Sequence, residues 1–247
     1  MGSQLHSLEW SQWRDVNPRT RSCKSPCAQA FDDALTRLGY AKAMRKLPYW
    51  MIRLGASIAL VLAILYLKPE PVVGHPPGIL VAEIPKQTAY HAAPFDKDGY
   101  TITPQATFDI HARVLGKNLY SARDEGGDIS PIDLLLGWKS LSDSAVLDQL
   151  TIKMRPRYYV WHTDNLPLPQ DEINRSMANM HMVPATLLIE KKLRAVRVGD
   201  LVHITGSLVN LQGPNNFDKA TSLTREDSGW GACEIIYVTD IAVYQQP

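Results

Sequence analysis

The 247-residue sequence has few cysteines, no excess of charge of either sign and a single long apolar run. Three cysteines are too few for a scaffold held together by disulfides. A formal net charge of +1 leaves no broad basic surface, so we expect no nucleic-acid partner. With 45% hydrophobic and 21% charged residues, the composition is that of an ordinary globular chain.

Metal and cofactor motifs are also missing from the sequence. Cys23 and Cys27 are spaced like half of a zinc finger, but no second Cys or His pair follows at finger spacing. The acidic residues around Gly126 and Gly127 lack the alternating spacing of an EF-hand loop. The sequence therefore predicts no metal ion and no cofactor.

The apolar run WMIRLGASIALVLAILYL, from Trp50 to Leu67, predicts a transmembrane helix over residues 50–68. A span of roughly 20 residues is required, so Arg53 would have to extend to the headgroups beside Tyr49 and Trp50. Two alternatives are a buried core helix and a cleaved signal peptide. On the first interpretation, the lipid bilayer is one partner of the chain.

Basic residues are concentrated before this run and predict its orientation. They are Arg14, Arg19, Arg21, Lys24, Arg37, Lys42, Arg45 and Lys46. The thirty residues after Lys68 contain only Lys86 and Lys97. Because positive flanks stay in the cytoplasm, the remainder of the chain should lie in the periplasm of a bacterium, anchored to the inner membrane.

This interpretation divides the chain into four segments. Residues 1–49 form a basic cytoplasmic segment with a short amphipathic helix near residues 25–44, and residues 50–68 cross the membrane. Residues 69–78 are a linker rich in proline and glycine, and residues 79–247 form an exported globular domain.

Periodicity in the exported segment predicts an α+β fold with a mainly antiparallel sheet. We expect strands at residues 78–84, 106–115, 150–161 with a bend at Pro156, 201–211 and 234–243. Helices are expected at residues 128–137, from Ser142, and at residues 171–177 and 185–196, the last two joined by a polar cluster. The pattern GDLVHITGSLV, in which a glycine lets the strand coil, suggests an OB-like or SH3-like barrel.

Asn179, His181 and Cys233 are the candidate catalytic residues. In extended chain Asn179 and His181 face one side, so the imidazole could accept a proton while the amide orients it. A cysteine beside a histidine is the minimum for a thiolate nucleophile. The alternatives are a histidine that braces a loop before a helix and a cysteine buried as a small apolar residue.

Two families of envelope cysteine enzymes differ from this sequence in detail. Sortases have an arginine after the cysteine, whereas the nearby arginine here, Arg225, precedes Cys233. L,D-transpeptidases have histidine and glycine immediately before the cysteine, and here those positions are Gly231 and Ala232.

Four stretches resemble a family of uncharacterised bacterial membrane-anchored proteins. They are DISPIDLLLGWKSLSD, NMHMVPA, GDLVHITGSLV and SLTREDSGWGACEIIYV, within residues 78–243. The resemblance implies a membrane anchor with an exported β-rich domain and implies no activity.

These features favour an envelope protein without enzymatic activity, whose anchored domain binds a partner protein or an envelope component at a concentration raised by the anchor. The alternative is a cell-envelope hydrolase or transferase that uses Cys233 and His181. The contact between these two side chains, and the exposure of the thiol, distinguish the functions.

Overall fold

The computed structural model describes residues 48–66, 71–90, 92–224 and 233–245. The chain divides into two compact units, Met1–Lys68 and Pro69–Pro247. The first unit contains helix α3 (Tyr49–Tyr66), in which the Arg53 guanidinium lies 4.8 Å from the centre of the Tyr49 ring. In the described ranges, no helix combines the length and the apolar character needed to cross a membrane. The expected helix at residues 25–44 and the Cys23–Cys27 pair lie outside the described residues.

The second unit is an α+β domain with a mainly antiparallel sheet, which confirms the predicted class. Its strands are β1 (Lys86–Ala89), β2 (Phe95–Lys97), β3 (Tyr100–Leu119), β4 (Ile132–Gly137), β5 (Thr151–Arg155), β6 (Tyr158–His162), β7 (Met177–Pro184), β8 (Leu201–Gln212), β9 (Asp218–Lys219) and β10 (Glu234–Tyr244). Its helices are η1 (Lys139–Ser142), α4 (Ser144–Leu147), α5 (Gln170–Arg175) and α6 (Leu187–Ala195).

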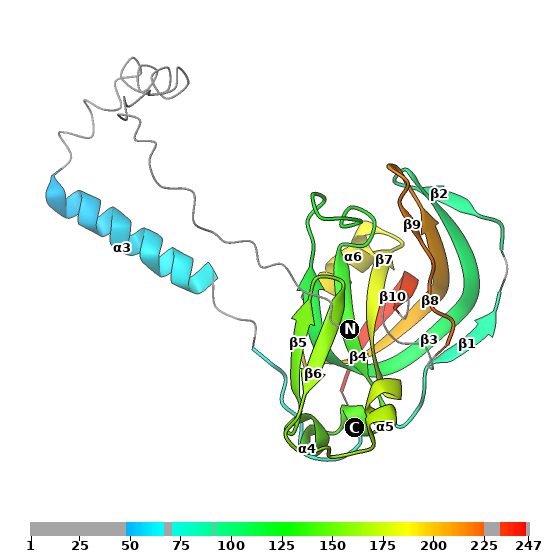
Figure 1. Cartoon of the computed structure of the whole chain (residues 1–247). Coiled ribbons are helices and arrows are strands. Elements are labelled where there is room, and N and C mark those ends of the chain that lie inside the picture. Colours follow the sequence, from blue (N-terminus) through cyan, green and yellow to red (C-terminus); the bar gives the residue numbers. More distant parts are fainter. Residues whose placement is uncertain (1–47, 67–70, 91, 225–232, 246–247) are drawn as a thin grey trace, which may run out of the picture. The chain divides into compact units, whose positions relative to one another are not determined.

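Five strands pair in a closed ring, in the order β3, β4, β7, β10, β8 and back to β3. The pair β7–β10 is parallel and the other pairs of the ring are antiparallel. Strand β3 closes the ring because its first part pairs with β8 and its last part pairs with β4. Figure 1 shows β3 as a long curved strand that reaches from β8 towards β4. Irregularities near Gln105 and Leu115 interrupt its register and help it to bend.

The main core fills the inside of this ring. Along β3 every second side chain from Ala106 to Val114 is buried, and the residues between them are mostly half-buried on the outer face. Ile189 and Leu193 of α6 join the same core, so this helix covers part of the ring interior. Thr186 begins the helix, since its hydroxyl accepts from the Ile189 amide.

Strand β4 stands where the sequence predicted a helix from residue 128 to 137, and that prediction is wrong. Every residue of β4, Ile132 to Gly137, is buried. A short apolar run that is buried on both faces has no period-2 alternation, so its pattern does not distinguish a strand from a helix. Asp133 in this strand bonds to side chains of neighbouring elements.

Three other local predictions were also wrong. Residues 150–161 form the hairpin β5–β6, which reverses at Pro156 and Arg157, rather than one bent strand. Residues 179–184 belong to β7 rather than to a link between helices. Residues 78–84 form no strand, because their amides find a side-chain partner: Leu80 and Val81 donate to the Ser142 hydroxyl.

The strands predicted at residues 106–115, 201–211 and 234–243 are confirmed as parts of β3, β8 and β10. The helices predicted at residues 171–177 and 185–196 correspond to α5 and α6. The helix expected from Ser142 is α4, and its cap is Asp143, which accepts from the Ala145 amide.

The second half of the proline-rich segment is bonded to the domain. The Val73 amide donates to the Val198 carbonyl, and His75 Nε2 lies 2.8 Å from the Gly199 carbonyl oxygen. The Ser144 hydroxyl donates to the His75 carbonyl. Residues 73–78 are therefore attached to the domain rather than acting as a free spacer.

Candidate active site

The register of three neighbouring strands brings the site residues together. Asp133 on β4 pairs with His181 on β7, and His181 pairs with Ile235 on β10. Cys233 stands immediately before β10. In an antiparallel pair, residues directly opposite each other point to the same face, so the β4–β7 register alone places Asp133 beside His181.

Asp133 is the centre of the site and is completely buried. Its Oδ1 lies 2.8 Å from His181 Nδ1 and 3.0 Å from Arg157 Nη1. Its Oδ2 accepts from the Tyr120 hydroxyl at 2.8 Å. Burial alone would raise the pKa of this carboxyl, but the hydrogen bond and charge of His181, with the charge of Arg157, hold the pKa below its usual value.

Arg157 reaches Asp133 from the turn of the β5–β6 hairpin. Its φ of 66° is in the left-handed region, which directs the side chain back towards β4. The guanidinium lies 3.7 Å from the centre of the Tyr120 ring and also donates to the carbonyls of Ser130 and Glu125. The Arg157 amide donates to the Tyr120 oxygen. The turn is thereby fixed to the buried carboxylate.

His181 connects Asp133 to the thiol of Cys233. Its side chain is 16% exposed. Burial lowers the pKa of this imidazole, but the hydrogen bonds to Asp133 and Cys233 and their charges raise it to about 9. Because Nδ1 faces Asp133, Nε2 is left for the sulfur. At neutral pH the structure therefore favours an imidazolium between a carboxylate and a thiol.

Cys233 is half-buried and carries a free thiol. Its Sγ lies 3.9 Å from the Arg157 carbonyl oxygen, in addition to its contact with His181. Cys233 and His181, which are far apart in the sequence, are thus close together in the fold. The thiol also has polar neighbours, so it is not enclosed by apolar side chains alone. Residues 225–232, including Arg225, lie outside the described residues.

Asn179 lies in the same cluster but does not orient the imidazole. Its Nδ2 is 3.5 Å from Asp133 Oδ2 and 3.4 Å from the Arg157 carbonyl oxygen. Its Oδ1 is buried and has no hydrogen-bond partner among the described residues. Asp133 provides the bond to His181 that the sequence analysis expected from this amide.

Sequence reasoning missed Asp133, Arg157 and Tyr120. One signal was present: a carboxylate inside the apolar run IDLLLG must find a partner if the run is buried. The partners themselves could not be identified, because they depend on the turn of one hairpin and on the register of β4 against β7.

Two cavities in the described part of the chain do not open on the thiol. One of about 450 Å³ lies between the loop after β3 and α6, and Tyr120, Asp128 and Arg194 are among its lining residues. The other, of about 460 Å³, lies on β6 and the loop after it, beside Val160 and Leu166. Neither is lined by Cys233, His181 or Asp133, and we base the assignment of the site on its hydrogen bonds.

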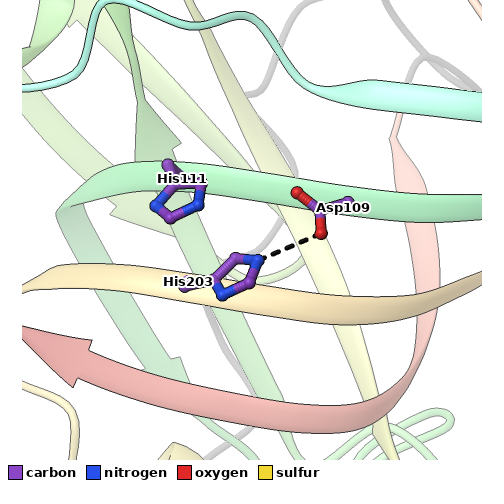
Figure 2. A group of neighbouring side chains, drawn as sticks. All are labelled: Asp109, His111 and His203. Carbon is purple, nitrogen blue, oxygen red and sulfur yellow. Dashed lines mark hydrogen bonds and ion pairs between the residues drawn. The ribbon is translucent and has the colours of Figure 1, made fainter.

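A separate group of side chains has the donor set of a metal site. Asp109, His111 and His203 each offer one ligand atom, and these atoms lie within 4.8 Å of one another (Figure 2). They belong to β3 and β8, whereas the Asp133 cluster belongs to β4, β7 and the segment before β10. The sequence analysis did not identify this group.

No family model matches the chain, and neither the curated proteins nor the solved structures include a detectable relative. The resemblance noted from the sequence therefore stays a resemblance, and the assignment of function rests on the site.

Proposed function

We propose that the domain is a cysteine-dependent hydrolase or transferase of the cell envelope. In this proposal Cys233 is the nucleophile, His181 is the acid and base, and Asp133 orients His181. The observation that carries it is the 2.8 Å contact between His181 Nδ1 and the buried Asp133 carboxylate, with the Cys233 thiol close enough to the same imidazole to help raise its pKa. A nucleophile, a base and a group that orients the base constitute the general pattern of such enzymes.

The raised pKa of His181 defines its first role in the reaction. An imidazole with a pKa of about 9 is protonated at neutral pH and cannot begin as a base towards a neutral thiol. In the scheme that we propose, Cys233 reacts as its thiolate, the nucleophilic form of a cysteine, after its proton has left to solvent. The Asp133 carboxylate holds the charge of the imidazolium.

The reaction proceeds from the thiolate and the imidazolium by acyl transfer. The thiolate attacks the carbonyl carbon of an ester, thioester or amide, and a carbon–sulfur bond forms. His181 Nε2 gives its proton to the departing alcohol, thiol or amine as the bond to the leaving group breaks. His181, now neutral, removes a proton from water or from an acceptor nucleophile, which attacks the thioester and releases Cys233 as thiolate.

Arg157 acts on the proposed chemistry indirectly, because its guanidinium bonds Asp133 rather than Cys233. Together with Tyr120, it keeps Asp133 ionised. An ionised Asp133 holds Nδ1–H of His181, which fixes both the tautomer and the direction of Nε2. Arg157 is thus a positioning residue in this scheme.

The test is the alkylation rate of Cys233 by iodoacetamide, followed by mass spectrometry of the peptide that contains it. Because a positive charge beside a thiol raises its reactivity, Cys233 should react at least about tenfold faster than Cys23 or Cys27 in denatured protein. His181→Asn and His181→Gln should abolish that advantage.

The matched control is His203→Asn, which removes a histidine that also bonds an aspartate but lies on another strand pair. It should leave the alkylation rate of Cys233 unchanged. If Cys233 reacts no faster than the two reference cysteines, or if His181→Asn has no effect, the proposed thiolate is wrong.

We also propose that the ring of five strands is an OB-like barrel. The support is the order of pairing, with one long strand shared between the two ends of the ring, one parallel pair (β7–β10), and α6 between the third and fourth strands of the ring in sequence. Barrels of this kind commonly bind ligands on their outer surface and in the loops around it.

Membrane anchoring remains a proposal from the sequence. It rests on the apolar residues 50–68 and on the basic residues before them, which place the N-terminus in the cytoplasm and the domain in the periplasm. Alkaline phosphatase fused after residue 247 in a bacterial host should be active, as it is only in the periplasm. The same enzyme should be inactive when fused after residue 45, and the reverse pattern would exclude this topology.

A second candidate function, binding of an envelope protein partner, is favoured by one observation. The hairpin β5–β6 exposes Tyr158 and Val160, and Leu166 lies nearby with 57% of its surface exposed. Exposed aromatic and aliphatic side chains beside a hollow are common at protein interfaces.

Pull-down from detergent-solubilised membranes tests this second function. A stoichiometric partner should be lost from the double variant Tyr158→Ser/Val160→Ser. The control Leu187→Ser removes a comparably exposed leucine from the start of α6 and should retain the partner. Recovery of the chain alone in several mild detergents would count against the function.

A further inference from the structure

Two histidines and one aspartate lie together on the outer face of the strand pair β3–β8. His111 on β3 is directly opposite His203 on β8, and Asp109 is two residues before His111 on the same face. His203 Nε2 lies 3.0 Å from Asp109 Oδ2, and the two imidazole rings are stacked with centroids 4.1 Å apart. Figure 2 shows the three side chains on the same side of the two strands.

The position of these side chains is both accessible and fixed. The side chains of His203 and Asp109 are 36% and 43% exposed, so an ion can reach them from solvent. The strand residues beside them, Ile110, Ala112 and Ile204, are completely buried. The register of β3 with β8 is regular from Ala106 to Arg113. The backbone that carries the cluster is therefore rigid, and only side-chain rotation is needed to adjust the ligands.

We propose that Asp109, His111 and His203 bind one divalent transition-metal ion of the zinc class. Two imidazole nitrogens and one carboxylate oxygen suit zinc, with ligand bonds of roughly 2.0–2.2 Å. Tetrahedral ligands at that distance are about 3.3 Å apart, and the present ligand atoms lie within 4.8 Å of one another. Small rotations of the side chains close this difference.

Three protein ligands leave a fourth position for water or a ligand. The ion would also join β3 to β8, the pair that closes the ring of strands. Metal binding should therefore stabilise the folded domain as well as occupy the site. The site is separate from the proposed cysteine chemistry and does not depend on it.

The positive charge of one neighbouring residue, Lys86, should weaken the binding of a cation at this site. Lys86 on β1 is directly opposite Asp109, and the two residues share a face of the sheet. Its positive charge competes for the carboxylate, so the variant Lys86→Gln should tighten zinc binding slightly.

The experiment is calorimetric titration of the full chain, freed of metal and held in mild detergent, with Zn²⁺ as the probe. The variant Cys233→Ser is titrated in parallel, so that thiol ligation at the other site is separated. We expect one equivalent of Zn²⁺ that is retained in Cys233→Ser. His111→Asn and His203→Asn should each weaken it by more than the tenfold to hundredfold typical of outer-shell partners. Asp109→Asn should weaken it less.

The matched control is His162→Asn. His162 also faces an aspartate, with Nε2 3.5 Å from Asp164 Oδ1, but the residue opposite it is Thr151 rather than a second histidine. Zinc binding should be unchanged in this variant.

Copper provides a readout that a merely structural role would not give. The electron paramagnetic resonance spectrum of bound Cu²⁺ should show coupling to two nitrogens in the wild type and to one in His111→Asn. The circular dichroism spectrum of each variant establishes that the domain is folded. The proposal is overturned if the variants that remain folded bind as the wild type does, or if His162→Asn loses as much affinity as His203→Asn.

Discussion

Two histidine–aspartate pairs on opposite parts of the ring have nearly the same geometry and very different surroundings. His181 Nδ1 is 2.8 Å from Asp133 Oδ1, and His203 Nε2 is 3.0 Å from Asp109 Oδ2. Asp133 is completely buried, whereas the side chain of Asp109 is 43% exposed. Water screens the exposed pair, His203–Asp109, and is excluded from the buried pair, His181–Asp133, so the same contact should differ in energy and in use.

Because they differ in burial, the two pairs are suited to different functions. In the buried pair the carboxylate also bonds Arg157 and Tyr120, and no part of it is accessible to a new ligand. In the exposed pair the carboxylate and the His203 imidazole, together with the neighbouring His111, remain open to solvent. The buried pair is suited to fix the charge of a catalytic imidazole, and the exposed pair is suited to bind a metal ion.

The largest expected effect on the free energy of unfolding is that of replacing Asp133. Asp133→Ala leaves the Arg157 and His181 cations without their buried partner, and it should lower the free energy of unfolding by about 3–5 kcal/mol. Urea denaturation of the full chain in detergent gives this value. An effect below about 1 kcal/mol would show that the buried cluster does not hold the fold.

The second effect concerns pH. The pKa of His181 is about 9 in the folded protein and near 6.5 when unfolded, so its stabilising contribution is complete below pH 6.5 and is lost as the pH rises through 9. The unfolding free energy should fall by up to about 3 kcal/mol over that window. The fall should be absent in His181→Asn and unchanged in His203→Asn. A flat profile of the wild type between pH 6.5 and 9 would contradict the raised pKa.

The third effect concerns the exposed pair, His203–Asp109. Zn²⁺ at about one hundred times its dissociation constant should raise the free energy of unfolding by about 2.7 kcal/mol. His203→Asn should remove this increase, and Asp133→Asn, if folded, should retain it. Equal stabilisation of the wild type and His203→Asn would place the ion elsewhere.

The smallest expected effect on the free energy of unfolding is that of replacing Asp109 in the absence of metal. Without metal, Asp109→Ala should change the free energy of unfolding by less than about 1 kcal/mol, because exposed ion pairs contribute little. The measurement is the same urea titration in the presence of a chelator. A loss comparable to that of Asp133→Ala would erase the distinction between the two pairs.

The amino-acid sequence predicted those strands whose two faces differ. Strand β3 alternates buried with half-buried or exposed residues from Tyr100 to Ala112, and β8 alternates over Val202–Thr205 and Val209–Gln212, and this alternation is visible in the sequence. Strand β4 is buried on both faces and β7 carries Asn179 and His181 among apolar residues, so neither has a simple period. Their identity depends on neighbours that are distant in the sequence.

The candidate site was predictable in part for the same reason. Cys233 and His181 were identified by residue type, because thiols and imidazoles are few in this chain and have specific chemistry. Asp133 lies 48 positions before His181, and Asp109 lies 94 positions before His203. Only the register of paired strands brings these residues together, and a single sequence does not specify that register.

The most direct test of the proposed chemistry is to trap the acyl intermediate. The full chain is mixed with an activated acyl ester such as p-nitrophenyl acetate, quenched in acid at successive times and analysed by mass spectrometry. We predict one acetyl group on Cys233 that forms and then decays, that forms at least about tenfold more slowly in His181→Asn, and that is absent in Cys233→Ser. Failure to acetylate Cys233, or acetylation at the same rate in His181→Asn and in the wild type, would contradict the account.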